Sequence, residues 1–122
     1  MADQRRLNRY AGAIKKALSA IIDLKLEDPD KGYITLTRVR VSPDLKIASV
    51  YYTVMGDAEQ KRKTEVVLKR SNTFLRNELK PSIKARWLPE LRFFYDDSID
   101  YAERIDTLLK QIKKNDTRSE EE

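Results

Sequence analysis

The carboxylates that follow residue 95 are the side chains of this chain best suited to carry out chemistry. Asp96, Asp97 and Asp100 lie close together in the sequence and could hold a Mg²⁺ ion for phosphodiester cleavage. The same aspartates suit the start of a helix, because acidic side chains stabilise the positive end of the helix dipole. Capping is the more economical interpretation, so we predict no metal site. A divalent-dependent nuclease is the enzymatic alternative.

Other catalytic classes lack their usual residues in this chain. The sequence contains no histidine and no cysteine. Ser-His pairs, Cys-His pairs and the common zinc ligand sets therefore cannot form. The lack of cysteine also excludes disulfides and is compatible with a reducing compartment. These absences argue against most enzyme classes, and we expect no cofactor.

A basic segment in the second half of the chain indicates a polyanionic partner. Residues 61–92 contain ten lysines and arginines against three glutamates, in a protein whose formal net charge is +5. Nucleic acids favour such segments, because cationic side chains release counterions when they bind phosphates. The alternative interpretation is a well-solvated helix face. The residues predicted to contact RNA phosphates are Lys69, Arg70, Arg76, Lys80, Lys84 and Arg86, with Arg38 and Arg40 extending the surface onto a strand.

Three aromatic side chains offer a second means of binding RNA. Tyr51, Trp87 and Phe94 could stack on unpaired bases, as aromatic residues do in proteins that bind single-stranded RNA. Such residues more often pack in a core or around its rim, and packing is the expectation for these three.

Apolar periodicities define the elements that position these residues. Residues 5–26 carry an apolar stripe at helical spacing, which predicts a long first helix. Residues 33–41 and 47–55 alternate as two strands joined by a short turn, and antiparallel pairing is the economical arrangement. The alternation changes phase within the first of these strands, which predicts a bulge near Thr37.

The basic segment begins in a helix that is interrupted. Ser71-Asn72-Thr73 combines three residues of mediocre helix propensity, although the apolar stripe resumes beyond them, so we predict a broken helix pair. We expect Arg70 and Arg76, which flank the break, to reach outward toward RNA. Pro81 predicts a bend or restart of the second helix near residue 80.

A third strand and a last helix complete the chain. Residues 91–95 alternate as a strand, and the helix that follows carries an apolar stripe of its own. The residues of that stripe are Ile99, Ala102, Ile105, Leu108, Leu109 and Ile112.

This order of elements predicts an α+β domain in which helices cover one face of a three-stranded sheet and leave the other face open. Residues 1–114 form the domain, and the polar, glutamate-ended tail 115–122 is expected to be disordered. No apolar run is long enough to span a membrane. We therefore expect a cytoplasmic protein. The chain also lacks a heptad run, so we expect a monomer.

The order of elements and several short motifs resemble the bacterial ribosome-binding factor A family. Each motif alone is common, but their order and spacing cover nearly the whole predicted domain. The matching motifs are Arg9-Tyr10-Ala11, Asp28-Pro29, Thr35-Leu36-Thr37-Arg38-Val39, Ser42-Pro43-Asp44-Leu45, Leu75-Arg76, Pro89-Glu90-Leu91-Arg92-Phe93 and Asp96-Asp97-Ser98.

The resemblance implies a type II KH-like fold, in which a helix-kink-helix replaces the Gly-x-x-Gly loop of ordinary KH domains. The kink falls on Ser71-Asn72-Thr73, where the family pattern has Ala-x-Gly. The resemblance further implies a factor that is not an enzyme, that binds free small ribosomal subunits during late maturation and that assists the processing or folding of their RNA. Its partners would be the small subunit, its RNA and other assembly factors. A general RNA chaperone and a translation-silencing factor that occupies mature subunits are the alternatives.

Overall fold

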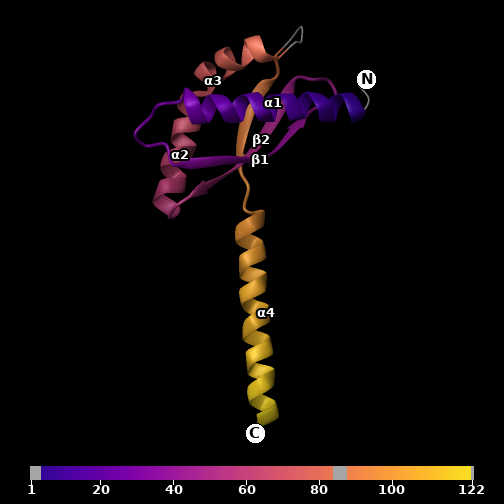
Figure 1. The fold of residues 1–122 in the computed structure, drawn as a ribbon, viewed down its shortest axis with the longest axis vertical. Helices are drawn as coiled ribbons and strands as arrows, with labels where there is room; N and C mark the ends of the chain where they lie inside the picture. Colours follow the sequence, from indigo (N-terminus) through magenta and orange to yellow (C-terminus); the bar gives the residue numbers. More distant parts are fainter. Residues whose placement is uncertain (1–3, 84–87, 122) are drawn as a thin grey trace.

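The computed structural model describes residues 4–83 and 88–121 and shows a layered body from which one helix extends (Figure 1). In chain order the elements are α1 Gln4–Leu24, β1 Tyr33–Val41, β2 Ile47–Met55, α2 Ala58–Arg70, α3 Asn72–Leu79, the 3-10 turn η1 Lys80–Ser82, β3 Glu90–Tyr95 and α4 Ser98–Glu121. The predicted α+β class is confirmed, because α1, α2 and α3 pack on one face of a three-stranded sheet. Among the described residues, no helix combines the length and apolar character needed to cross a membrane.

The sheet has the strand order β1-β2-β3. β1 and β2 pair antiparallel, as predicted, and β3 lies parallel to β2. Ser42 closes the hairpin, since its N–H donates to the Ile47 carbonyl at 2.9 Å and its hydroxyl accepts from the Ile47 N–H at 3.0 Å. The parallel third strand is reached through the α2 and α3 helices, which is the long crossover that a parallel pair requires.

A bulge in β1 changes which side chains face the core. The register with β2 shifts between Leu36 and Arg38, which confirms the irregularity predicted near Thr37. Leu36 and Val39 can both face the core because the extra residue restores the alternation. The bulge also directs the Thr37 hydroxyl to Asp96, to which it donates at 2.6 Å. β1 is thereby tied to the segment that follows β3.

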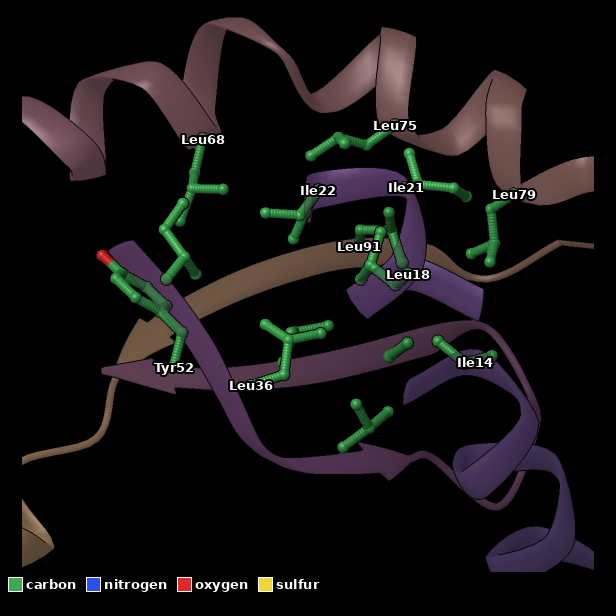
Figure 2. Close-up of a cluster of buried hydrophobic side chains, with 14 of the residues drawn as sticks. Ile14, Leu18, Ile21, Ile22, Leu36, Tyr52, Leu68, Leu75, Leu79 and Leu91 are labelled. Atoms are coloured by element: carbon green, nitrogen blue, oxygen red, sulfur yellow. The ribbon is translucent and has the colours of Figure 1, made fainter. Parts of the chain in front are cut away.

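The apolar stripe of α1 is buried against the inner face of the sheet. Figure 2 shows Ile14 and Leu18 of α1 in one cluster with Leu36 and Leu91, which belong to two different strands. Full burial of one such side chain stabilises the fold by roughly 1.5–3 kcal/mol. The α2 and α3 side chains that close the same core are Val67, Leu68, Leu75 and Leu79.

The predicted break in the helix pair is present, and it occupies one residue. Ser71 has φ −93° and ψ 3°, so it lies in a region that any residue can adopt at modest cost. Helical hydrogen bonding continues on both sides, because Ser71 N–H donates to Val67 O and Leu75 N–H donates to Ser71 O, each at 2.9 Å. The break needs no positive φ, and Thr73 therefore fits inside α3 where the family pattern has glycine.

Asn72 and Pro81 fix the two ends of α3. The Asn72 side chain donates to the Leu91 carbonyl at 3.0 Å, which ties the break to β3. Pro81 lies in η1, directly after α3 ends at Leu79, so the restart predicted near residue 80 is confirmed as a 3-10 turn. The proline ring could not continue a regular helix without losing a backbone hydrogen bond.

α4 extends away from the body and covers neither face of the sheet (Figure 1). From Ala102 to Ile112 the side chains of its apolar stripe are exposed, with Leu108 at 52% and Ile112 at 56%. α4 continues through Glu121, and the expectation that residues 115–122 are disordered stays a prediction. Residues 115–122 contain no apolar side chain, whereas the absence of glycine and proline from residues 98–121 leaves the helix uninterrupted. The domain boundary at residue 114 stays a prediction.

Candidate nucleic-acid interface

The cationic side chains predicted to bind RNA lie on two different faces of the body. Arg38 and Arg40 are exposed on the open face of the sheet. The helical layer on the opposite face carries Lys69, Arg70, Arg76 and Lys80. Lys84, Arg86 and Trp87 fall outside the described residues. The structure therefore divides the predicted surface into two parts.

Arg70 has an internal partner. Its Nη2 donates to Asp28 Oδ2 at 2.6 Å and lies 3.7 Å from Asp30 Oδ2. The hydrogen bond from Arg70 lowers the pKa of the Asp28 carboxyl, and the same bond raises the pKa of Arg70. The guanidinium thus ties the end of α2 to the connection between α1 and β1. The Arg70 side chain is nevertheless 52% exposed, so the RNA contact predicted for it stays a prediction.

Arg76 is also engaged within the fold. Its Nη2 donates to the Leu88 carbonyl at 2.9 Å. The bond ties α3 to the segment that leads into β3, while Arg76 itself is exposed, and the RNA contact predicted for it stays a prediction. Both arginines that flank the break therefore have a structural role, whatever else they contact.

Lys69 and Lys80 remain available on the outer side of the helical layer. Both side chains are exposed, and Lys69 Nζ lies 3.3 Å from Glu65 Oε1, one turn earlier on α2. Exposed pairs of this kind contribute little and open readily. A phosphate could therefore replace the Glu65 carboxylate as the partner of Lys69 without disturbing the fold.

The first half of α1 is a second basic stretch on the helical layer. Arg5, Arg9 and Lys16 are exposed, and the first turn of α1 contains no acidic residue. These exposed cations would stabilise a bound polyanion.

The open face of the sheet carries aromatic side chains next to arginines. Tyr51 pairs in register with Arg38 on one side and with Phe94 on the other. The Arg38 Cζ lies 4.4 Å from the centroid of the Tyr51 ring, and the Tyr51 and Phe94 centroids are 5.5 Å apart. Tyr51 and Phe94 thus pack on each other but outside the core. Arg92, absent from the predicted contacts, lies on the same face, and strand alternation with Phe94 was the signal that could have found it.

The aspartates after β3 act as structural acceptors. Asp96 accepts hydrogen bonds from the Ser98 N–H at 3.0 Å and from the Thr37 hydroxyl at 2.6 Å. Hydrogen bonds from the Ser98 and Thr37 side chains lower its pKa to about 2. Asp100 accepts from the Tyr95 hydroxyl at 3.0 Å and from Lys61 Nζ at 3.2 Å. Across residues 4–83 and 88–121, no three acidic side chains gather closely enough to share a metal ion.

A three-stranded sheet covered on one face by helices, with a helix pair interrupted at a single residue, defines this chain as a KH-like α+β domain. The chain belongs to the ribosome-binding factor A family, because the sequence profile of that family matches residues 6–109. The match spans every element from α1 to β3 and the first half of α4.

Solved structures of similar chains support this assignment. The crystal structure of ribosome-binding factor A from Thermus thermophilus is 28% identical over 73% of this chain and 94% of its own, with a TM-score of 0.63. The solution structure of a Thermotoga maritima protein described as a putative ribosome binding factor A is 28% identical over 80% and 93%, with a TM-score of 0.65. Coordinates of the Thermus thermophilus factor fitted into a cryo-electron microscopy map of a 30S complex are 30% identical over 71% and 91%, with a TM-score of 0.60.

Proposed function

We propose that this protein binds the small ribosomal subunit during its late maturation and assists the processing or folding of the ribosomal RNA without catalysing a reaction. The observation that carries the proposal is the family match over residues 6–109. The relative that was fitted into a map of a 30S complex supports the choice of subunit. Free small subunits and other assembly factors are the expected partners, which places the protein in the cytoplasm.

The charge distribution supports an RNA contact on the helical layer. Lys69 and Lys80 are exposed there, and the basic first half of α1 lies on the same layer. Such cations contact phosphates and so position a protein on RNA without reading its sequence. Arg70 and Arg76 are poor choices for testing this contact, because each makes a hydrogen bond within the fold. Their replacement would remove that bond as well as any contact with RNA.

Sedimentation of the tagged protein from cell lysate tests the proposal. The protein should comigrate with free small subunits and be scarce on joined ribosomes, and the RNA of its subunits should retain precursor ends. A general RNA chaperone would show no preference for small subunits. A translation-silencing factor would instead sediment with subunits whose RNA ends are fully processed. Either of these two results would contradict the proposed function.

A matched pair of variants tests the helical layer. Lys69 and Lys110 are each about three-quarters exposed, at 75% and 77%, and each pairs with an acid one turn earlier on its helix. Lys69→Glu should weaken association with small subunits severalfold, whereas Lys110→Glu, with the same change of charge on α4, should have a much smaller effect. Equal losses would show that net charge, and not the helical layer, determines binding.

A further inference from the structure

Within residues 4–83 and 88–121, no helix covers the open face of the sheet. α1, α2 and α3 occupy the opposite face, and α4 points away from the body (Figure 1). An uncovered antiparallel face normally presents polar side chains to solvent. Here Phe94, on the edge strand β3, is 44% exposed.

A continuous row of flat side chains crosses this face. Arg38, Tyr51 and Phe94 occupy the same register position on β1, β2 and β3. The guanidinium lies 4.4 Å from the tyrosine ring centroid, and the two ring planes are inclined by only 30°. The row therefore presents the exposed Phe94 ring and, beside it, a guanidinium stacked on the Tyr51 ring, two flat surfaces on which planar groups can stack.

The neighbouring row adds positive charge. Arg40, Ser49 and Arg92 share the next register position of this kind, two residues along each strand. Two carboxylates share the face: Glu90 lies 3.3 Å from Arg92, and Asp96 is bonded to Thr37 and Ser98. The three arginines exceed the two acids, so the face is mildly basic.

We propose that this open face is a second RNA-binding site, which takes an unpaired strand with about two bases stacked on Phe94 and on the Arg38–Tyr51 pair. Arg40 and Arg92 would then contact the phosphates. The proposal rests on the proposed function only in taking RNA as the polymer. It adds a site on the face opposite the helical layer.

An RNA strand suits this face better than a protein surface does. The buried centre of a protein interface is depleted of charged residues, and covering Arg38 and Arg92 with apolar side chains would leave their charges unpaired. Unpaired nucleotides offer flat rings for the aromatic row and phosphates for the arginines. A duplex offers phosphates alone, because its bases are stacked on one another.

Fluorescence anisotropy with a labelled, unstructured oligouridylate of about twelve nucleotides tests the site. Phe94→Leu keeps an apolar side chain of similar volume but removes the ring, and should weaken binding by about tenfold. Phe94→Tyr restores a ring and should bind like the unchanged protein. Arg92→Gln should lower the dependence of log affinity on log salt by about 0.7, the value for one phosphate contact on a single strand.

Two controls separate stacking from other causes. Tyr101→Leu removes an aromatic ring that is 64% exposed on α4, and should leave the affinity unchanged. With an RNA duplex of the same length, Phe94→Leu should also have no effect. A thermal melt of each variant establishes that it is folded, and Arg92→Gln, at an exposed position, keeps the test valid if Phe94→Leu is unstable.

The outcomes distinguish this proposal from the proposed function. The open-face site is overturned if folded Phe94→Leu binds the oligonucleotide as the unchanged protein does, or if Tyr101→Leu loses binding equally. A Phe94→Leu variant that binds the oligonucleotide normally but no longer sediments with small subunits would assign the face to a protein partner, which also overturns the site. If the unchanged protein fails to sediment with small subunits yet binds the oligonucleotide through Phe94, the proposed function fails and this site stands.

Discussion

α1 and α4 are the two longest helices that the structure describes, and they differ in whether their apolar side is buried. They contain 21 and 24 residues, and both repeat apolar side chains at helical spacing. Leu18 of α1 has no exposed surface, whereas Leu108 of α4 is 52% exposed. An amphipathic pattern therefore predicts a helix and the direction of its apolar side, but not whether anything lies against that side.

The difference between the two helices follows from how the chain connects them to the sheet. α1 lies across the inner face of the sheet, and Arg70 ties its exit to α2 through Asp28. α4 starts where β3 leaves the sheet and continues outward (Figure 1). Its first turn is held by hydrogen bonds from Tyr95 and Lys61 to Asp100. Apolar burial thus holds α1 in place, whereas polar contacts at one end hold α4.

Substitution of one leucine in each helix tests this comparison most strongly. Leu18→Ala should lower the free energy of unfolding by about 3 kcal/mol, because it removes a fully buried side chain and leaves a cavity. Leu108→Ala should change it by no more than about 0.5 kcal/mol. Leucine and alanine both favour helices, so the difference reports burial and not helix propensity. Urea unfolding followed by circular dichroism measures both values.

The same experiment can contradict the difference in burial between α1 and α4. A loss for Leu108→Ala as large as that for Leu18→Ala would mean that the apolar side of α4 is packed in solution. Repeating the measurement over a hundredfold range of protein concentration would then show whether a second copy covers it, since only association makes stability depend on concentration.

A smaller effect is expected at the polar contact that holds the exit of α1. Arg70→Gln removes the charged partner of Asp28, whose side chain is only 14% exposed, and should lower the urea midpoint measurably but less than Leu18→Ala does. Lys69→Gln, next to it in sequence, removes an exposed pair with Glu65 and should leave the midpoint nearly unchanged. If Arg70→Gln also leaves the midpoint unchanged while small-subunit binding falls, the original expectation for Arg70 as an RNA contact is the better one.

Alternation and propensity were sufficient to predict most of the fold. The phase change in β1 located the bulge near Thr37, and Ser71 lies within the three residues predicted to break the helix. The site was harder to predict, because periodicity gives the direction of a side chain but not its partner. Arg70 lies 42 residues from Asp28 in the sequence, and no local pattern relates them.

The open face of the sheet also shows that periodicity gives the direction of a side chain but not its neighbours. Strand alternation places Phe94 and Arg92 on one face, and Tyr51 on the outward face of its own strand. Only the register of the strands brings Tyr51 between Arg38 and Phe94. The sequence suggested packing or stacking for these rings as alternatives. The structure shows that Tyr51 and Phe94 pack on each other outside the core and that Phe94 remains 44% exposed, and stacking on bases stays a proposal.

The smallest expected effect concerns the start of α4 and depends on pH. The pKa of Asp96 is about 2, below its ordinary value of 3.8, because the Ser98 and Thr37 hydroxyls and the Ser98 N–H donate to the ionised carboxylate. A folded-state pKa below the unfolded one means that this group stabilises the fold above about pH 4. That contribution is lost as the pH falls from about 4 toward 2.

Asp96→Asn should therefore be less stable than the unchanged protein at pH 5, and the difference should close as the pH approaches 2. Asp28, Asp44 and Asp100 also have lowered pKa values, so both proteins lose stability in acid, and the difference between them isolates Asp96. Leu18→Ala provides the matched comparison from α1. Its deficit involves no proton and should stay constant over the same range. Urea unfolding of the three proteins at several pH values measures the two differences, and a deficit for Asp96→Asn that does not change with pH would show that the ionised carboxylate does not hold the start of α4.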